Sequence, residues 1–170
     1  MIAPEFSRLV DERQVTAKPL QLEATAEERA ALTKRFGLIA IDRLEANVAI
    51  ERHGEALAAR GKLCAAIVQS CAVSGEDLPV TIEEPLAMRF VPTAPEPSDE
   101  EIELAESDLD EIPFEGHVFD LGEAVAQSLA LAIDPYATGP EAERVRKEKG
   151  LNDEAARGPF SVLKGLKTGN

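Results

Sequence analysis

The stretch that decides the fold of this chain is residues 44–67, LEANVAIERHGEALAARGKLCAAI. Apolar and polar side chains alternate from Leu44 to Ile50, and a second, longer apolar series runs from Leu57 to Ile67. A period of two is typical of β-strands that bury one face. His53-Gly54-Glu55 supplies a turn between the two series. The stretch therefore predicts a long antiparallel hairpin.

Shorter strands are predicted on both sides of the hairpin. Alternation at residues 20–24 predicts a strand before it, and a turn at 74–77 leads to two more strands, at 80–82 and 86–90. Pro85 lies between these last two and cannot donate a ladder hydrogen bond, so we expect it to break the ladder and that strand to be an edge or to bend there. Together these segments predict an antiparallel meander of five or six strands.

A first helix is predicted at Ala26–Phe36. Thr25 lies immediately before it and Glu28 follows three residues later, which is the spacing of a capping box. Gly37 follows the last turn and can adopt the left-handed conformation that ends a helix.

A second helix begins after Asp120, with Glu123 at the capping-box position, and ends before Asp134-Pro135. A polar third helix is predicted over residues 140–149, because it opens with proline and stops at a glycine. The predicted fold class is α+β: a single domain in which an antiparallel β-meander packs against two helices, with a disordered acidic loop and a basic C-terminal tail.

The whole chain has a formal net charge of −14, and most of this charge lies in its second half. Residues 92–140 contain thirteen Asp/Glu and no Lys or Arg, whereas residues 141–170 contain seven Lys/Arg and five Asp/Glu. Residues 92–113 also contain four prolines, and a self-repelling segment that buries little apolar surface does not order itself. We expect a flexible acidic loop there, inside an α+β domain that spans residues 1–136.

Two interpretations of the acidic loop stay open: a solvated linker, or an electrostatic mimic of RNA that holds a basic protein. The candidate interaction residues in it are Asp99, Glu100, Glu101, Glu103, Glu106, Asp108, Asp110 and Glu111.

The remaining segment, 137–170, holds the polar helix and the tail. Phe160, Leu163 and Leu166 are spaced along one face of a short helix, and Lys164 and Lys167 flank them. Such a segment can dock back on the core, enter a groove of a partner, or contact RNA. The candidate RNA- or partner-binding residues are Arg144, Arg146, Lys147, Phe160, Leu163, Lys164, Leu166 and Lys167.

Several function classes find little support in the residues. Cys64 and Cys71 are separated by six residues, which is too wide for a zinc pair, and we expect two small buried apolar side chains. His53 and His117 are isolated, so neither a metal site nor a nucleophilic dyad is indicated. No cofactor, small-molecule substrate, signal peptide or membrane span is predicted, and the cytoplasm is the expected location.

Three stretches together resemble a known family. They are GKLCAAIVQSCAV at 61–73, FDLGEAVAQSLALAIDP at 119–135 and PFSVLKGLK at 159–167. In this order, with an acidic loop between the first two, they resemble the large ribosomal RNA subunit accumulation protein family (YceD-like). Many members carry Cys-x-x-Cys at the strand end, but here Ser74 follows Cys71 at that spacing. A metal or redox role of such a pair is therefore not carried over.

The resemblance implies a non-enzymatic ribosome-biogenesis factor that supports accumulation or maturation of 23S ribosomal RNA. The expected partner is precursor large-subunit RNA, an early-binding basic ribosomal protein, or both. A carrier for one basic ribosomal protein is the alternative. An RNA-processing hydrolase is a further one, although its carboxylates would have to be held rigidly.

Overall fold

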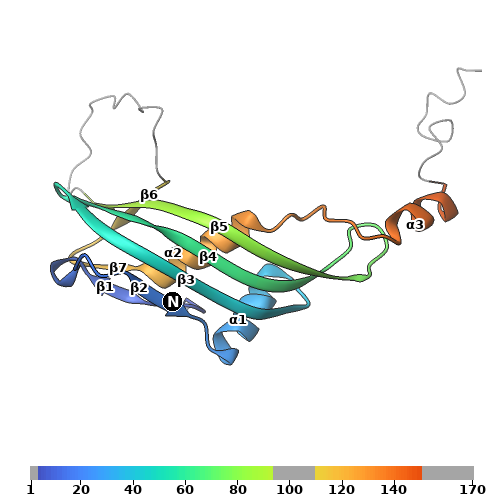
Figure 1. The fold of residues 1–170 in the computed structure, drawn as a ribbon, viewed down its shortest axis with the longest axis horizontal. Coiled ribbons are helices and arrows are strands. Elements are labelled where there is room, and N and C mark those ends of the chain that lie inside the picture. Colours follow the sequence, from blue (N-terminus) through green and yellow to red (C-terminus); the bar gives the residue numbers. More distant parts are fainter. Residues whose placement is uncertain (1–3, 94–109, 151–170) are drawn as a thin grey trace, which may run out of the picture. The chain divides into compact units, whose positions relative to one another are not determined.

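The computed structural model describes residues 4–93 and 110–150, and its mixed α+β class is the predicted one. A five-stranded sheet has the order β2-β3-β4-β5-β6, and a separate two-stranded sheet joins β1 to β7 (Figure 1). The strands of the large sheet are β2 (Leu20–Glu23), β3 (Ala40–His53), β4 (Ala56–Ser70), β5 (Asp77–Pro92) and β6 (Asp110–Phe114). The other elements are β1 (Leu9–Asp11), a 3-10 turn at Glu12–Gln14, β7 (Val118–Asp120), α1 (Ala26–Phe36), α2 (Leu121–Ala132) and α3 (Ala142–Glu148).

The predicted hairpin is confirmed as β3 and β4, which pair antiparallel from Ala40↔Val68 to His53↔Ala56. Gly54 lies in the turn at φ +64°, a conformation that glycine adopts without strain. Gly61 serves packing instead, because a Cβ at this position would lie 1.9 Å from the backbone oxygen of Asn47 on β3. The close approach of the two strands therefore requires a glycine there.

The predicted break of the strand at Pro85 is absent, because β5 runs continuously from Asp77 to Pro92, but the predicted edge is present at this position. β6 pairs only with Met88–Pro92, so no described strand lies beside β5 at Pro85. A proline breaks no ladder hydrogen bond where its nitrogen faces such an open edge.

The second difference concerns β6, which pairs parallel to β5 and so departs from a purely antiparallel meander. A parallel neighbour needs a connection of about a dozen residues or more, and the chain between Pro92 and Asp110 is long enough for one. Residues 110–113, expected within the acidic loop, therefore lie in a strand.

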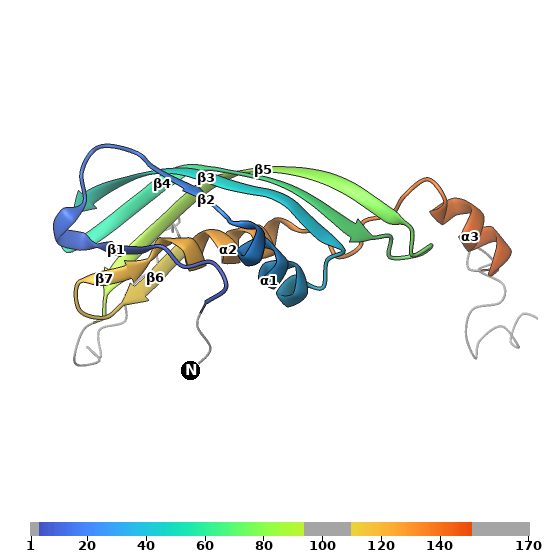
Figure 2. The same cartoon turned by 90° about the horizontal axis from the view of Figure 1, so that it is seen from below.

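The two helices predicted to pack on the sheet, α1 and α2, lie on the same face of the five strands (Figure 2). The capping box before α1 is present, with Thr25 and Glu28 as predicted, and Gly37 at φ +65° ends the helix. Asp120 caps α2 by accepting the Glu123 backbone N–H at 3.1 Å. The core between helices and sheet contains fully buried side chains from both helices, namely Leu32, Leu121, Val125 and Leu129.

The N-terminal segment also contributes to this core, although it lies far from β7 and α2 in the sequence. β1 pairs antiparallel with β7, and Phe6, just before β1, is fully buried. The Phe119 ring lies 4.3 Å from that of Phe90 and 5.7 Å from that of Phe114, centroid to centroid. Three strands thus meet in one aromatic cluster.

A second compact unit contains Ser70–Leu78 and the chain from Pro135, of which the structure describes residues up to 150. Within it, Ala72 N–H donates to the oxygen of Ala137 at 3.0 Å, and Glu141 N–H donates to Glu76 Oε1 at 3.1 Å. Helix α3 agrees with the predicted polar helix.

Candidate macromolecular interface

The face of the large sheet opposite α1 and α2, called the outer face below, is covered by neither of these helices (Figure 2). Alternation places the side chains of β3, β4 and β5 that are not in the core on this face. Long charged side chains lie opposite short ones there, as in the register pairs Arg43↔Ala66 and Ala49↔Arg60. The charged groups consequently project beyond the short side chains around them, where a partner with a flat surface can contact them.

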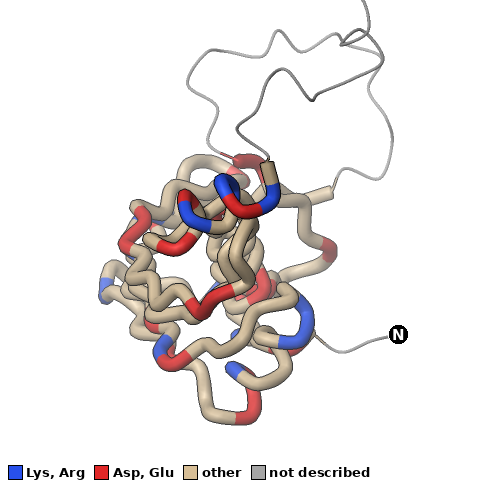
Figure 3. The backbone as a smooth tube through the Cα atoms, turned by 90° about the vertical axis from the view of Figure 1, so that its right-hand side faces the viewer, with Lys and Arg blue, Asp and Glu red and all other residues tan. Residues whose placement is uncertain are grey.

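Several charges on the outer face are compensated by a neighbouring side chain. Lys62 Nζ lies 2.6 Å from Glu83 Oε2, and Arg89 Nη1 lies 3.3 Å from Glu111 Oε1. Exposed pairs of this kind add little to stability, because solvent screens them. The same mixing of signs extends along the backbone of the described residues (Figure 3). The outer face is therefore a mixed surface without a continuous basic stripe.

One basic hollow of about 250 Å³ interrupts the outer face at the end of the β3–β4 hairpin. It is lined by His53, Ala58, Arg60 and Arg89. Among the described residues Arg60 forms no ion pair, so its guanidinium keeps its hydrogen-bond donors for an external group. A phosphate or a carboxylate fits these donors. The sequence offered no signal for this hollow beyond placing Arg60 on the polar side of its strand.

The predicted basic residues of α3 are also compensated locally. Arg144 contacts Glu141 at 2.6 Å and Glu148 at 3.0 Å, and Arg146 contacts Glu143 at 2.9 Å. Hydrogen bonding to Glu141 raises the pKa of Arg144. Lys147 is exposed. The other predicted residues of this group, Phe160, Leu163, Lys164, Leu166 and Lys167, lie outside the described residues.

The predicted acidic residues are divided in the same way. Asp110 and Glu111 are exposed on β6. The rest of that group, Asp99, Glu100, Glu101, Glu103, Glu106 and Asp108, lies outside the described residues.

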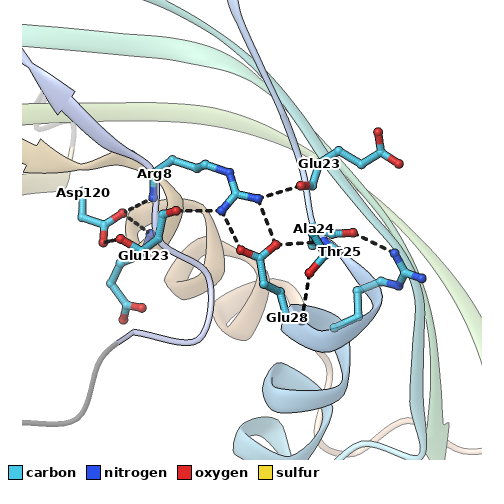
Figure 4. Close-up of polar contacts among 9 residues, drawn as sticks. Arg8, Glu23, Ala24, Thr25, Glu28, Asp120 and Glu123 are labelled. Carbon is cyan, nitrogen blue, oxygen red and sulfur yellow. Dashed lines mark hydrogen bonds and ion pairs between the residues drawn. The ribbon is translucent and has the colours of Figure 1, made fainter.

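Several strongly perturbed ionisable groups form a polar cluster between the N-terminal segment and both helix starts (Figure 4). The Arg8 guanidinium binds both oxygens of Glu28, at 2.6 and 2.9 Å, and lowers the pKa of Glu28 to about 2. The Asp120 carboxylate accepts the Ser7 hydroxyl at 2.6 Å and the Arg8 backbone N–H at 2.8 Å.

Perturbed pKa values can mark functional sites, but here every shift comes from a partner within the fold. Arg35 extends the network by binding both oxygens of Glu123, at 2.8 and 3.0 Å, and Glu5 Oε2 at 2.9 Å. We interpret the cluster as a set of structural contacts that hold the N-terminal segment against α1 and α2.

Cys71 is buried, as predicted, but it is not an inert apolar side chain. Its sulfur accepts the backbone N–H of Ser74 at 3.3 Å and that of Gly139 at 3.4 Å. Hydrogen bonding from Ser74 is the main cause that lowers the pKa of Cys71 to about 6, against the effect of burial. Cys64 is half-buried on the outer face. In the described part of the chain, no group of three or more His, Cys, Asp or Glu is placed to hold a metal ion.

Within residues 4–93 and 110–150, no helix has the length and apolarity needed to cross a membrane. Comparison with protein families gives a match over residues 59–167 to the family described as large ribosomal RNA subunit accumulation protein YceD. The matched range begins in β4 and includes β5, α2 and α3. Neither the curated proteins nor the solved structures give a match.

Proposed function

This chain belongs to the YceD family of large ribosomal RNA subunit accumulation proteins, and we propose that it supports accumulation of 23S ribosomal RNA by binding a basic protein of the precursor large subunit. The family match over most of the chain is the observation that carries the role in large-subunit RNA accumulation. A binding role is proposed, and not a catalytic one, because the family is described by accumulation and not by a reaction. Ribosome assembly places the proposed action in the cytoplasm.

The charge of the chain supports a basic partner. The described residues contain 23 Asp/Glu and 15 Lys/Arg, so the excess of acid is present even without the acidic loop. Arg8, Arg35 and Arg144 are each held by carboxylates of the same chain. Complementary charge accelerates encounter with a basic protein and disfavours nucleic-acid phosphates.

Precursor RNA is the second candidate partner, and the basic hollow of the outer face supports it. Arg60 supplies guanidinium donors without an ion pair among the described residues, and His53 and Arg89, which also contacts Glu111, lie beside it. Two or three such groups can hold a phosphate without making the protein a general RNA binder. The predicted tail lysines, Lys164 and Lys167, would add to this contact.

The test uses the purified full chain. Isothermal titration against individual basic large-subunit proteins, at low and high salt, is expected to show one or a few salt-sensitive complexes, whereas a transcript of precursor 23S RNA binds weakly. Binding to the transcript alone, lost in Arg60→Glu, would favour RNA as the partner. A strain that lacks the chain is expected to hold less 23S than 16S RNA relative to wild type. An unchanged ratio together with no complex contradicts the proposal.

A further inference from the structure

A groove runs along the open edge of β5 beside the end of α2, and nothing in the proposed function has used it. It encloses about 200 Å³, and we call it the edge groove. Its lining includes Glu84, Leu86, Met88, Asp110, Leu131 and Ala132.

One edge of β5 faces no described strand along most of this groove. β6 covers β5 only from Met88 onward, so the edge from Pro79 to Ala87 faces no described strand. An open edge offers backbone donors and acceptors to an extended peptide. Pro85 removes one donor from this edge, which limits the length of any added strand and disfavours indiscriminate pairing.

The side chains in the groove combine carboxylates with exposed apolar surface. Glu84 belongs to the inward series of β5, between the buried Ile82 and Leu86, and is itself exposed. Leu131 is 82% exposed on α2. Among the described residues, Glu84 and Asp110 form no ion pair, in contrast to their sequence neighbours Glu83 and Glu111.

This chemistry selects one kind of occupant. A lysine or arginine side chain can lay its aliphatic stem on Leu131 and Ala132 and place its charged head at the carboxylates. RNA phosphates are repelled by the same carboxylates. A second copy of the chain, paired edge to edge, would bring its own Glu84 toward this one, which like-charge repulsion opposes.

We propose that the edge groove binds a short extended segment of a basic protein, whose lysine or arginine side chain meets the carboxylates of Glu84 and Asp110. The inference rests on the proposed function, since it names where the basic partner docks. The segment adds backbone hydrogen bonds to β5 and covers Leu131.

Fluorescence anisotropy of labelled five-residue peptides tests the proposal on the full chain. The basic probe peptide has the sequence Val-Lys-Val-Arg-Val. The acidic control peptide has Glu in place of both Lys and Arg. The basic peptide is expected to bind, and Glu84→Lys is expected to weaken it about tenfold or more, because it removes a charge-assisted contact and adds repulsion. Leu131→Ser is expected to weaken binding severalfold. Glu55→Lys, the same charge change in the exposed β3–β4 turn, is the matched control and should bind like wild type.

Equal binding by wild type and Glu84→Lys, or equal binding of the acidic peptide, would overturn the proposal. Preference for an RNA oligonucleotide of similar size would overturn it as well. Sedimentation of the same variants is the further check, because a change of oligomeric state in Glu84→Lys would identify a second copy as the occupant. If a whole basic ribosomal protein still binds Glu84→Lys with wild-type affinity, the groove is excluded and the proposed function stands. If no basic protein binds even to wild type, both fail.

Discussion

Arg8 and Glu28 form a two-pronged ion pair, with Nη1–Oε1 at 2.6 Å and Nη2–Oε2 at 2.9 Å. The same carboxylate accepts the backbone N–H of Thr25 at 2.8 Å and so closes the capping box of α1. One side chain thus fixes a helix start and holds the N-terminal segment, twenty residues away in sequence. The local cap and the long-range contact stabilise each other because both need Glu28 in the same position.

Replacing Glu28 should therefore cost more than an ordinary surface change. Glu28→Ala loses the acceptor for the Thr25 backbone N–H and the ion pair with Arg8, and we expect the free energy of unfolding to fall by about 1–3 kcal/mol. Glu28→Gln keeps an acceptor for Thr25 and should cost less, about 1 kcal/mol or below. Urea unfolding of both variants beside wild type measures the two losses. Glu55→Gln, an exposed carboxylate in a turn, is the matched control.

The contribution of the Glu28 charge should depend on pH. The pKa of Glu28 is about 2 in the folded chain, below its ordinary value of 4.5, so the folded state binds its proton less readily. The stabilisation is fully present above pH 4.5 and is lost as pH falls toward 2. The stability gap between wild type and Glu28→Gln should shrink from pH 6 to pH 3. A gap of constant size would show that the ion pair with Arg8 does not form in solution.

Gly122→Ala should destabilise the chain although it lies inside a helix. An ordinary helix position gains about 1 kcal/mol when alanine replaces glycine. Here the added Cβ would lie 2.7 Å from the Arg8 nitrogen and 2.8 Å from the Phe6 oxygen, and these backbone atoms cannot swing aside. We expect a loss of about 1–3 kcal/mol in urea unfolding. A gain would mean that the N-terminal segment does not pack on α2.

Phe119→Ala should be among the most damaging core substitutions. Phe119 is 3% exposed and contacts Phe90 and Phe114, so its removal leaves a cavity where β5, β6 and β7 meet. The expected loss is about 3–5 kcal/mol, measured as a lower denaturation midpoint. Leu131→Ala, at an 82% exposed position, should change stability by less than about 0.5 kcal/mol. Similar losses in both variants would contradict this packing.

Cys71 should titrate as an acidic thiol. Its pKa is about 6, against an ordinary 9.0, because Ser74 and the backbone N–H of Gly139 donate to the sulfur. Ultraviolet absorbance of the thiolate in Cys64→Ser should rise near pH 6, and Ser74→Ala should move the rise toward higher pH. The pKa of Cys71 is lower in the folded chain than in the unfolded chain. The thiolate therefore stabilises the fold fully above about pH 9, and this contribution is lost as pH falls through 6. A rise near pH 9 in Cys64→Ser would contradict the hydrogen bonding.

The secondary structure near the hairpin was predictable because its signals are local. Alternation over residues 44–67 predicted β3, β4 and their turn, and the capping box at Thr25 and the N-cap at Asp120 predicted both helix starts. The family was also predictable from the sequence, because its motifs are short stretches in a fixed order. The predicted site residues could not be tested in this way, because most lie outside the described residues and the two arginines of α3 are bound by neighbouring carboxylates.

The sequence by itself determined the hairpin, the helices and the excess of acid, because each depends on neighbouring residues or on composition. Only the tertiary structure decided that β6 pairs parallel to β5, that β1 pairs with β7, and that Arg8 reaches Glu28. These pairings join residues far apart, and no short period in the sequence records them. The open edge of β5 follows from where β6 stops, so the edge groove with Glu84 and Leu131 could be found only once the strands were in place.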